Sequence, residues 1–365
     1  MDVSSEMIHA LLPVFMITSL GASAFTVGLL EGLAESTALL VKVFSGVLSD
    51  AIGRRKPLAL FGYGLGAATK PFFALATASS TIFAARLVDR IGKGVRGAPR
   101  DALVADLAPP EIRGAAFGLR QSLDTVGAFL GPLLAVALML ATGDDFRAVF
   151  WWAVIPAVLS VALLAFGIRD TPPSRAIRAN PLARDSLRRL GPACHRIVLL
   201  GAVFSLARFS EAFLVLRAQT TGVPLAFVPL VMVVMNVVYA SAAYPFGKWS
   251  DRMAARDLLA ASLVVLVVAD LVLAVADSPA ALAGGVVLWG LHMGMSQGLL
   301  ARMVADVAPP ELRGTAFGAF NFASGLALLV ASGLAGFLWE AHGPQATFIA
   351  GAGFAASTWL LLRRF

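Results

Sequence analysis

The chain has 365 residues, of which 58% are hydrophobic and 14% are charged, and its formal net charge is +7. A soluble domain is nearer half apolar and a quarter charged, so this composition argues against a cytosolic enzyme, a disordered chain and a nucleic-acid-binding domain. The one cysteine, Cys194, excludes an internal disulfide, and the four histidines lack the spacing of metal ligands. The composition therefore predicts a protein dissolved in lipid that binds no catalytic metal.

Apolar stretches of helix length alternate with short breaks that contain glycine, proline or charged residues. A membrane-spanning helix takes roughly 20 residues, and each stretch is close to that length. The first runs from the N-terminus to about Leu20. The others lie at about 25–48, 57–76, 82–104, 113–141, 148–168, 197–217, 224–249, 258–276, 280–304, 313–341 and 346–362. The sequence therefore predicts an all-α membrane protein with twelve transmembrane helices.

Basic residues lie on one set of the predicted loops. They follow helix two at Arg54, Arg55 and Lys56 and recur on equivalent loops of the second half, whereas the opposite loops carry only Arg147. Residues 169–196, between the sixth and seventh helices, add seven arginines and four prolines. By the positive-inside bias, both chain ends and this linker are expected to be cytoplasmic, which explains the net charge without a nucleic-acid partner.

Two stretches of the chain are near copies of each other. Residues 104–118 read VADLAPPEIRGAAFG and residues 304–318 read VADVAPPELRGTAFG, which match at twelve of fifteen positions with an offset of 200. A match this close is a strong repeat signal. It predicts a first six-helix bundle over 1–168, the basic linker over 169–196 and a second bundle over 197–365, related as parallel repeats by an axis along the membrane normal.

A weaker copy relates Ser5 and Glu6 in helix one to Ser210 and Glu211 in helix seven. Helix seven has about fourteen residues between Arg196 and Glu211, whereas only five residues precede Glu6. Either helix one is short or the sequence begins inside it, and we expect the second. Because the repeat places both Ser-Glu pairs at equivalent depth on equivalent helices, we expect Glu6 and Glu211 to face each other across a central cavity.

The break after helix two carries a motif. Residues 46–56 read GVLSDAIGRRK, which resembles the G-x-x-x-D-x-x-G-R-R-K signature of the major facilitator superfamily, and the twelve helices, the repeat and the basic linker extend the resemblance over the full chain. The resemblance implies the fold of that superfamily, two six-helix bundles, and secondary transport by alternating access. A loop that only sets topology would explain the three basic residues but neither the aspartate nor the glycines.

The same motif implies a cytoplasmic gate. Gly46 allows close helix approach, Gly53 allows a tight turn, and Asp50 can bind the N-terminus of a facing helix, where unpaired N–H groups favour an anion. In the superfamily such contacts join helix two to helix eleven, and helix eight to helix five, when the cytoplasmic side is shut. The gate is therefore expected to contain these three residues together with Arg54, Arg55, Arg113, Asp251 and Arg313.

Helix four carries charge on one face. Spacings of three, four and seven place Arg86, Asp89, Arg90 and Lys93 together, and charges inside a membrane face a cavity or partners rather than lipid. The stretch resembles the superfamily's fourth-helix motif, whose arginine is associated with proton transfer. Arg86 occupies that place, although Asp89 and Arg90 replace the usual Gln-Gly. The alternative interpretation is an ion-pair network that holds helices together.

Helix five carries Arg120, Gln121 and Asp124 ahead of residues 127–132, which read GAFLGP. Arg120 and Asp124 are four residues apart and can pair along one face. The glycine stretch resembles the fifth-helix motif of drug and proton exchangers, although the trailing Gly-Gly is absent. Small residues at this spacing also serve ordinary helix packing, so both interpretations stay open.

Two groups of candidate residues follow from these features. Desolvated acids and an arginine that approaches them can form a protonation switch. The proton-coupling candidates are Glu6, Arg86, Asp89, Asp124 and Glu211. The substrate-cavity candidates are Arg90, Lys93, Arg120, Gln121, Arg208 and Arg217, whose charges favour an anionic or zwitterionic solute over a cationic one. Asp270, near the outer end of helix nine, is expected to be solvated.

The expected function is proton-coupled secondary active transport of a small anionic or amphipathic solute across a bacterial-type cytoplasmic membrane, with export by proton antiport. A proton symporter or uniporter for an anionic metabolite is the first alternative, and a transporter-like membrane sensor without transport is the second. No P-loop or nucleotide fingerprint is present, so we expect neither an ATP-driven pump, an enzyme nor a cofactor. The expected partners are the solute, protons and the lipid bilayer around a monomer.

Overall fold

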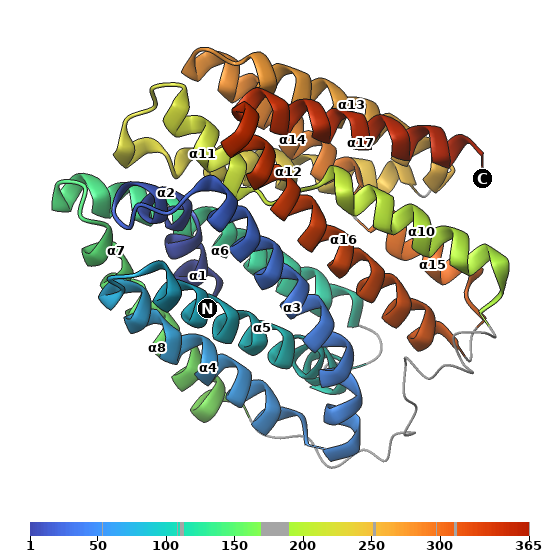
Figure 1. Cartoon of the computed structure of the whole chain (residues 1–365). Helices are drawn as coiled ribbons and strands as arrows, with labels where there is room; N and C mark the ends of the chain where they lie inside the picture. Colours follow the sequence, from blue (N-terminus) through green and yellow to red (C-terminus); the bar gives the residue numbers. More distant parts are fainter. Residues whose placement is uncertain are drawn as a thin grey trace. The chain divides into compact units, whose positions relative to one another are not determined.

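The computed structural model describes residues 1–52, 54–107, 109, 113–168, 190–250, 253–296, 298–309 and 312–364. Within the helices, the side chains of residues 46, 47, 50–52, 105, 106, 113–118, 121, 122, 250, 313 and 314 lie outside this description. The described chain is built of helices and the turns between them (Figure 1). These residues contain no strand, so the all-α prediction is confirmed.

The helices follow the ranges predicted from hydropathy. Those of the first half are α1 (Asp2–His9), α2 (Leu12–Thr18), α3 (Ala24–Ile52), α4 (Arg55–Leu75), α5 (Ser79–Leu107), α6 (Arg113–Thr142), α7 (Phe146–Trp152) and α8 (Val154–Gly167). Those of the second half are α10 (Gly191–Ala207), α11 (Ala212–Thr220), η2 (Leu225–Phe227), α12 (Leu230–Ser250), α13 (Ala255–Val275), α14 (Pro279–Ser296), α15 (Leu299–Val307), α16 (Arg313–His342) and α17 (Pro344–Arg363). Nine helical segments among the described residues are long and apolar enough to cross a membrane.

Several of these ranges are divided into two helical segments. The first predicted helix divides into α1 and α2 just before Pro13, whose ring and missing N–H group interrupt a helix. The sixth divides at Ala153 into α7 and α8. The tenth divides into α14 and α15, and α15 is preceded by Gly298, whose φ of +72° is left-handed.

The seventh predicted helix divides at Arg208, Phe209 and Ser210, between α10 and α11. Arg208 has φ −112° and ψ 66°, which ends the helical hydrogen-bond pattern. The N–H group of Ser210 donates instead to Oγ of Ser332 on α16 at 3.1 Å. Broken helices in membrane transporters free backbone groups near binding sites, so this break marks a place where function can be expected.

The helix bounds extend the repeat beyond the copied motif. α4 spans Arg55–Leu75 and α13 spans Ala255–Val275, while α5 begins at Ser79 and α14 begins at Pro279. α6 and α16 both contain 30 residues, and their bounds also differ by 200. The same offset therefore holds over three pairs of helices, and residues 200 apart in these pairs are equivalent.

Contacts divide the chain into two compact units. The first unit contains Met1–Leu12 and Leu33–Asn180, and the second contains Pro13–Gly32 and Pro181–Phe365. The beginning of α3 therefore packs with the second unit, and the remainder of α3 packs with the first. The bundles and linker expected from the repeat stay a prediction, and residues 169–189 of that linker lie outside the described residues.

Glycines set the closest helix crossing of the first unit. A methyl group added to Gly62 on α4 would come within 2.6 Å of the carbonyl oxygen of Gly92 on α5. One added to Gly92 would come equally close to the carbonyl oxygen of Gly62. Only bare backbone fits at this crossing, so the two helices approach closely enough for their long charged side chains to meet.

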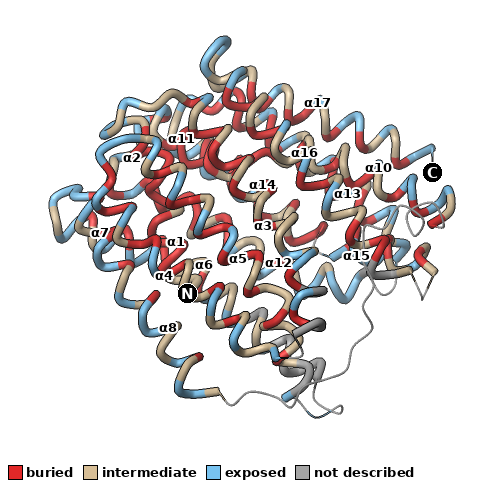
Figure 2. Tube along the Cα trace, turned by 60° about the horizontal axis from the view of Figure 1, so that its bottom comes forward, coloured by how far each residue is buried: buried red, intermediate tan, exposed pale blue. Residues whose placement is uncertain are grey.

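Apolar side chains cover the outer faces of the helices. α8 buries only Ala157 and Leu164 and leaves Phe166 91% exposed. Figure 2 shows exposed and half-buried residues along most of this helix. An apolar surface of this kind fits hydrocarbon rather than water, and a helix satisfies its own backbone groups there. The chain is therefore an integral membrane protein.

Candidate functional site

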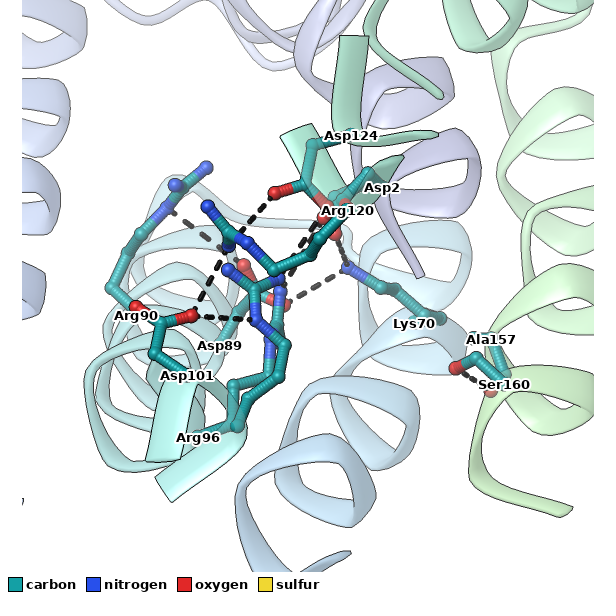
Figure 3. A network of polar contacts seen from close by, with 12 residues as sticks. Asp2, Lys70, Asp89, Arg90, Arg96, Asp101, Arg120, Asp124, Ala157 and Ser160 are labelled. Carbon is teal, nitrogen blue, oxygen red and sulfur yellow. Dashed lines mark hydrogen bonds and ion pairs between the residues drawn. The ribbon is translucent and has the colours of Figure 1, made fainter. Parts of the chain in front are cut away.

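Charged side chains from neighbouring helices meet inside the first unit (Figure 3). Nζ of Lys70 on α4 lies 2.9 Å from Oδ1 of Asp89 on α5 and donates to Oγ of Ser5 on α1 at 3.1 Å. Lys70 and Asp89 are only 1% and 2% exposed. Buried charges of this kind are tolerated when each has its partner, so this contact fixes three helices at one point.

Arg90 joins α3 to the same carboxylate. Its Nη1 lies 3.0 Å from Oε1 of Glu35, and its Nε lies 3.8 Å from Oδ2 of Asp89. Arg86, which is 1% exposed, adds a further positive charge near Asp89. Each carboxylate oxygen of Asp89 therefore has a cation near it, Lys70 at Oδ1 and Arg90 at Oδ2.

Arg96, two turns further along α5, links the network to the start of the chain. Its Nη2 lies 3.8 Å from Oδ1 of Asp2, and its guanidinium carbon lies 4.9 Å from the ring centroid of Tyr63, a cation–π distance. A methyl group added to Gly66 would come within 3.2 Å of Nη1 of Arg96 and 3.4 Å of Oδ1 of Asp89. Gly66 thus leaves the space that these charged groups occupy.

A second group of ion pairs joins α5 to α6 nearer the surface. Nη1 of Arg120 lies 3.2 Å from Oδ1 of Asp101 and 3.1 Å from Oδ2 of Asp124, so the pairing expected from the spacing of Arg120 and Asp124 is formed. Nη1 of Arg100 lies 3.5 Å from Oδ1 of Asp124. These side chains are between 22% and 32% exposed, so they exchange with water more easily than Lys70 and Asp89 do.

The glycine stretch of helix five packs α6 against α1. A methyl group added to Gly127 would come within 2.9 Å of Cβ of Asp2, and one added to Gly131 would come within 2.6 Å of Cβ of Glu6. The packing role that the sequence left open is therefore present. Glu6 also has its Oε2 at 3.4 Å from Nδ1 of His9 on the same helix. The motif thus holds two acids of α1 directly against α6.

The carboxyl groups of Asp2 and Asp124 lie close to each other (Figure 3). Because two neighbouring carboxylates repel each other, a proton on one of the two groups is favoured. Arg100 and Arg120 contact Asp124, and Arg96 lies near Asp2. The two acids can therefore share one proton, and cations already in place can stabilise the negative charge when that proton leaves.

The whole network is close to neutral. Its basic members are Lys70, Arg86, Arg90, Lys93, Arg96, Arg100 and Arg120, and its acidic members are Asp2, Glu6, Glu35, Asp89, Asp101 and Asp124. Seven basic side chains thus face six acidic ones, of which five are ionised when Asp2 and Asp124 share a proton. The basic face expected on helix four is therefore largely neutralised by its neighbours.

In the second unit, predicted residues gather at the break of helix seven. Arg208 lies near Glu211 and Tyr239, and its guanidinium carbon is 5.8 Å from the ring centroid of Phe204. The break separates α10 from α11 between these charges. The arrangement places an acid, a base and a phenol at a discontinuous helix, where transporters commonly bind solutes or ions.

Arg217, another predicted cavity residue, is engaged with the end of α13. Its Nε donates to the carbonyl oxygen of Leu273 at 2.9 Å, and its Nη2 donates to those of Ala274 at 3.1 Å and Ala276 at 2.6 Å. Nη1 donates to Oγ1 of Thr220 at 3.2 Å. A cation at a helix C-terminus satisfies carbonyl groups that have no helical partner, so these contacts give Arg217 a role in capping α13.

Most of the predicted gate falls outside the described part of the chain. Two of its residues, Gly53 and Asp251, are not described at all, and only the backbone of four others is described. The predicted residues concerned, with Gln121 of the cavity, are Gly46, Asp50, Gly53, Arg113, Gln121, Asp251 and Arg313. Arg54 is exposed, and Nη1 of Arg55 donates to Oγ of Ser49 at 3.2 Å. The gate stays a prediction.

The sequence prediction omitted several members of the network. Arg96 and Arg100 continue the face of Lys93 at spacings of three and four, so extending the helical pattern would have found them. Asp2 carried no comparable signal, because its partners Arg96 and Asp124 lie on other helices. Asp2 and Asp124 come together only because α1 packs against α6.

The prediction that Asp270 is solvated is wrong. Asp270 lies on α13, is 0% exposed, and both of its carboxyl oxygens are buried. α13 extends to Val275 and packs against α14 and α17, so Asp270 is more than a helical turn inside the end of the helix and is covered by its neighbours.

Comparisons with known proteins agree with these features. The sequence matches the Major Facilitator Superfamily over residues 1–217 and 197–365. It is 31% identical over 370 residues to an MFS-type transporter of Methanocaldococcus jannaschii, covering 99% of this chain and 91% of that protein. It is 26% identical over 338 residues to the multidrug resistance protein MdtH of Photorhabdus laumondii, covering 91% of this chain and 82% of that protein.

Solved structures show the same fold. The crystal structure of a POT family transporter in complex with 5-aminolevulinic acid matches this chain with a TM-score of 0.83 at 13% identity, covering 100% of this chain and 93% of that one. At this identity the likeness concerns the fold alone. The fold expected from the motif at residues 46–56 is confirmed.

Proposed function

Because the chain belongs to the Major Facilitator Superfamily, we propose that it is a proton-coupled secondary active transporter that exports a small solute by proton antiport. The observation that carries proton coupling is the proximity of the carboxyl groups of Asp2 and Asp124, because two neighbouring acids favour a proton on one of them. Ionisable groups inside membrane helices are rare and mark ion and proton pathways.

A group that couples transport to protons must bind and release its proton, so neither its protonated nor its ionised state can be strongly unfavourable. The arginines that contact Asp124, at 3.1 Å for Arg120 and 3.5 Å for Arg100, stabilise its carboxylate, while the negative charge of the neighbouring Asp2 favours its protonated form. Both protonation states therefore have partners. Because Asp2 and Asp124 lie on different helices, a change in their spacing during transport alters the balance between these states.

The same reasoning separates Asp124 from the other candidates. Asp89 faces Lys70 and Arg90 on its two oxygens and is deeply buried, so it is better suited to anchoring helices than to carrying a proton. Arg86 adds a further positive charge near the Asp89 carboxylate. Glu6 and Glu211 remain candidates for contacts with the solute or the proton, at the surface of α1 against α6 and at the break of helix seven.

Export and location are supported by sequence features and by a relative. The stretch at residues 127–132 resembles the motif of drug and proton exchangers, and one relative bears the name of a multidrug resistance protein. The distribution of basic residues favours cytoplasmic termini in the inner membrane of a bacterial-type cell. The near-neutral network favours an amphipathic solute with at most one net negative charge, because a more anionic solute would compete with the acids already present.

The test uses the purified full chain in liposomes that contain a pH-sensitive dye. Thermal-shift screening against metabolites and antibiotics first identifies solutes that stabilise the protein. Addition of such a solute should move protons in wild-type vesicles, and Asp124→Asn should abolish this movement while solute exchange without a gradient continues. Asp277→Asn, at an exposed loop position, is the matched control. Solute transport without proton movement would instead establish a uniporter, and binding without transport a sensor.

A further inference from the structure

A buried carboxyl group in the second unit has no role in the network of the first. Asp270 on α13 is 0% exposed, and neither of its oxygens has a hydrogen-bond partner among the described residues. Buried polar groups are normally hydrogen-bonded, and buried charges are normally paired. An acid that has neither within the described structure needs an explanation.

The repeat shows what the second unit lacks at this place. The equivalents of Asp270 and Trp289 are Lys70 and Asp89, because the bounds of their helices differ by 200. Lys70 and Asp89 form the buried ion pair of 2.9 Å that joins α4 to α5. In the second unit, the acid lies where the first unit has its cation, and the facing position is Trp289, which is uncharged and 0% exposed. Asp270 is therefore no remnant of a structural ion pair.

The carboxyl group lies in a slot made by a glycine and closed by aromatic rings. A methyl group added to Gly351 on α17 would come within 2.7 Å of Oδ2 of Asp270 and equally close to Cε1 of Phe209. The ring of Phe209 lies 5.4 Å from that of Trp289 and 5.6 Å from that of Phe348. On the side of Oδ2 that faces Gly351, there is thus no room for an additional carbon atom.

Phe209 connects this slot to the break of helix seven, since it lies between the end of α10 and the start of α11. The neighbouring Ser210 N–H donates to Ser332 rather than to its own helix. Such a break allows a local change of backbone at lower energetic cost than a continuous helix does. The ring of Phe209, which lies beside Gly351 as the Asp270 carboxyl group does, is therefore carried by a segment able to move.

Other titratable or charged groups on the surrounding helices do not pair with Asp270. Nδ1 of His292 on α14 lies 2.8 Å from the carbonyl oxygen of Ser262, and Arg217 donates to carbonyl oxygens at the end of α13. Further groups of this kind are Cys194, His195, Arg196, Arg208, Glu211, Arg256, Asp257, Arg302, Asp306 and Arg363. None of these described groups forms a hydrogen bond or an ion pair with Asp270.

We propose that Asp270 is a proton-binding site of the second unit, protonated while Phe209 covers it. An ionised carboxylate here would be a buried charge without a counter-ion, which is strongly unfavourable. A metal ion would need several oxygen ligands and the space for them, and the slot offers neither beside Oδ2. The proton is the one cation that fits, since it adds no volume.

When the cover moves, the O–H bond of the carboxyl group breaks, its proton passes to water and a carboxylate remains. Solvation then stabilises the charge that the closed slot rejects. This adds a second proton site to the one at Asp2 and Asp124. That this proton takes part in transport rests on the proposed function, whereas the protonated state of Asp270 does not.

Infrared spectroscopy of the purified full chain in lipid nanodiscs at neutral pH tests the protonated state. A protonated carboxyl group has a C=O stretching band separate from that of a carboxylate. Asp270→Asn should remove one such band, because asparagine keeps the shape and neutrality of the protonated acid. Asp277→Asn, the same chemical change at an exposed position seven residues along, should leave the band in place. Equal band intensity in wild type and Asp270→Asn would overturn the proposal.

Asp270→Glu keeps the test decisive should the asparagine variant fail to fold. It retains a carboxyl group in a slightly different place, so the band should shift in frequency and persist. A band that neither shifts nor weakens would belong to another acid and would overturn the proposal.

Thermal unfolding against pH provides an independent measurement. An acid that is protonated when folded and ionised when unfolded makes the folded state less stable as pH rises. Asparagine cannot ionise, so the Tm of Asp270→Asn should exceed that of wild type by an amount that grows from pH 4 to pH 8. Parallel curves would overturn the proposal. A band at Asp270 without proton-driven transport would reject the proposed function alone, and proton-driven transport without the band would reject this inference alone.

Discussion

Arg147 and Arg217 bind equivalent carbonyl groups 200 residues apart, although they lie on helices that the repeat does not relate. Nη2 of Arg147 on α7 donates to the carbonyl oxygen of Ala76 at 2.7 Å, and Nη2 of Arg217 on α11 donates to that of Ala276 at 2.6 Å. These carbonyls close the C-terminal ends of α4 and α13. In both halves, an arginine therefore binds carbonyl groups that have no helical partner at this helix end. The two arginines come from helices that are not equivalent in the repeat.

Removing either arginine should destabilise the protein. Arg217→Gln breaks charged hydrogen bonds to buried carbonyls, each worth about 1.5–3 kcal/mol, so the free energy of unfolding should fall by at least that amount. Arg147→Gln should act similarly, with a smaller loss because its donors contact two carbonyls of α4 rather than three of α13. Thermal unfolding in detergent measures both.

The control for these variants is Arg302→Gln. The side chain of Arg302 is 44% exposed and lies 3.9 Å from Asp306 on the same helix, so its loss should change stability by less than about 0.5 kcal/mol. Equal losses in all three variants would mean that the caps contribute nothing beyond general surface charge.

The Lys70–Asp89 pair should show strong coupling in a double-mutant cycle. Lys70→Met or Asp89→Leu alone leaves a charge buried without its nearest partner, which costs about 3–5 kcal/mol. The double variant removes both charges, so its loss of unfolding free energy should be smaller than the sum of the single losses. Chemical denaturation of the four proteins measures the cycle, and additive losses would show that the two charges do not depend on each other.

Gly131→Ala should weaken the packing of α1 against α6. The added methyl group would lie 2.6 Å from Cβ of Glu6 and 2.7 Å from the carbonyl oxygen of Val3, so the helices must separate. Overpacking of this kind costs about 1–3 kcal/mol of stability, read from the Tm. Gly64→Ala on α4 is the matched control, because no atom lies within 4 Å of its added methyl group. That variant should be neutral or more stable by about 0.5–1 kcal/mol, since alanine favours helix.

Hydropathy located the helices because membrane spans must be apolar and continuous in sequence, and the helices of the described chain lie in the predicted ranges, although several ranges are divided in two. It did not locate the break at Phe209. That break depends on the Ser210 N–H finding Ser332 on α16, more than a hundred residues away. Local pattern carries no information on such a partner, so the sequence predicted one continuous helix there.

The candidate site was also predictable only in part, where the pattern along one helix carried the signal. The helical spacing of Arg86, Asp89, Arg90 and Lys93 indicated a charged face, and the structure places that face in a buried network. Two of the acids that neutralise it, Asp89 and Asp101, lie on α5 itself. The others come from other helices, so their pairing with this face could not be assigned from the sequence. They are Asp2, Glu6, Glu35 and Asp124. Asp270 was misjudged because distance from a helix end says little about burial when neighbouring helices cover that end.

α3 belongs to both units, and this suggests a test of the transport cycle. Its first residues pack in the second unit, where an added methyl group at Gly32 would lie 3.1 Å from Cβ of Ser332 on α16. Disulfides need Cβ atoms about 3.5–4.5 Å apart, so cysteines at these two positions can be joined after a small shift. The chain has one native cysteine, Cys194, which is buried, so the background of unwanted cross-links is low.

If alternating access requires α3 to separate from α16, then locking this contact should stop transport. Gly32→Cys combined with Ser332→Cys should lose solute-driven proton movement in liposomes on mild oxidation and regain it on reduction, because the cross-link holds the start of α3 in the second unit. Each single-cysteine variant, oxidised in the same way, should keep its activity. A fully cross-linked protein that still transports would show that this contact persists through the cycle, and that the movement of α3 occurs elsewhere along the helix.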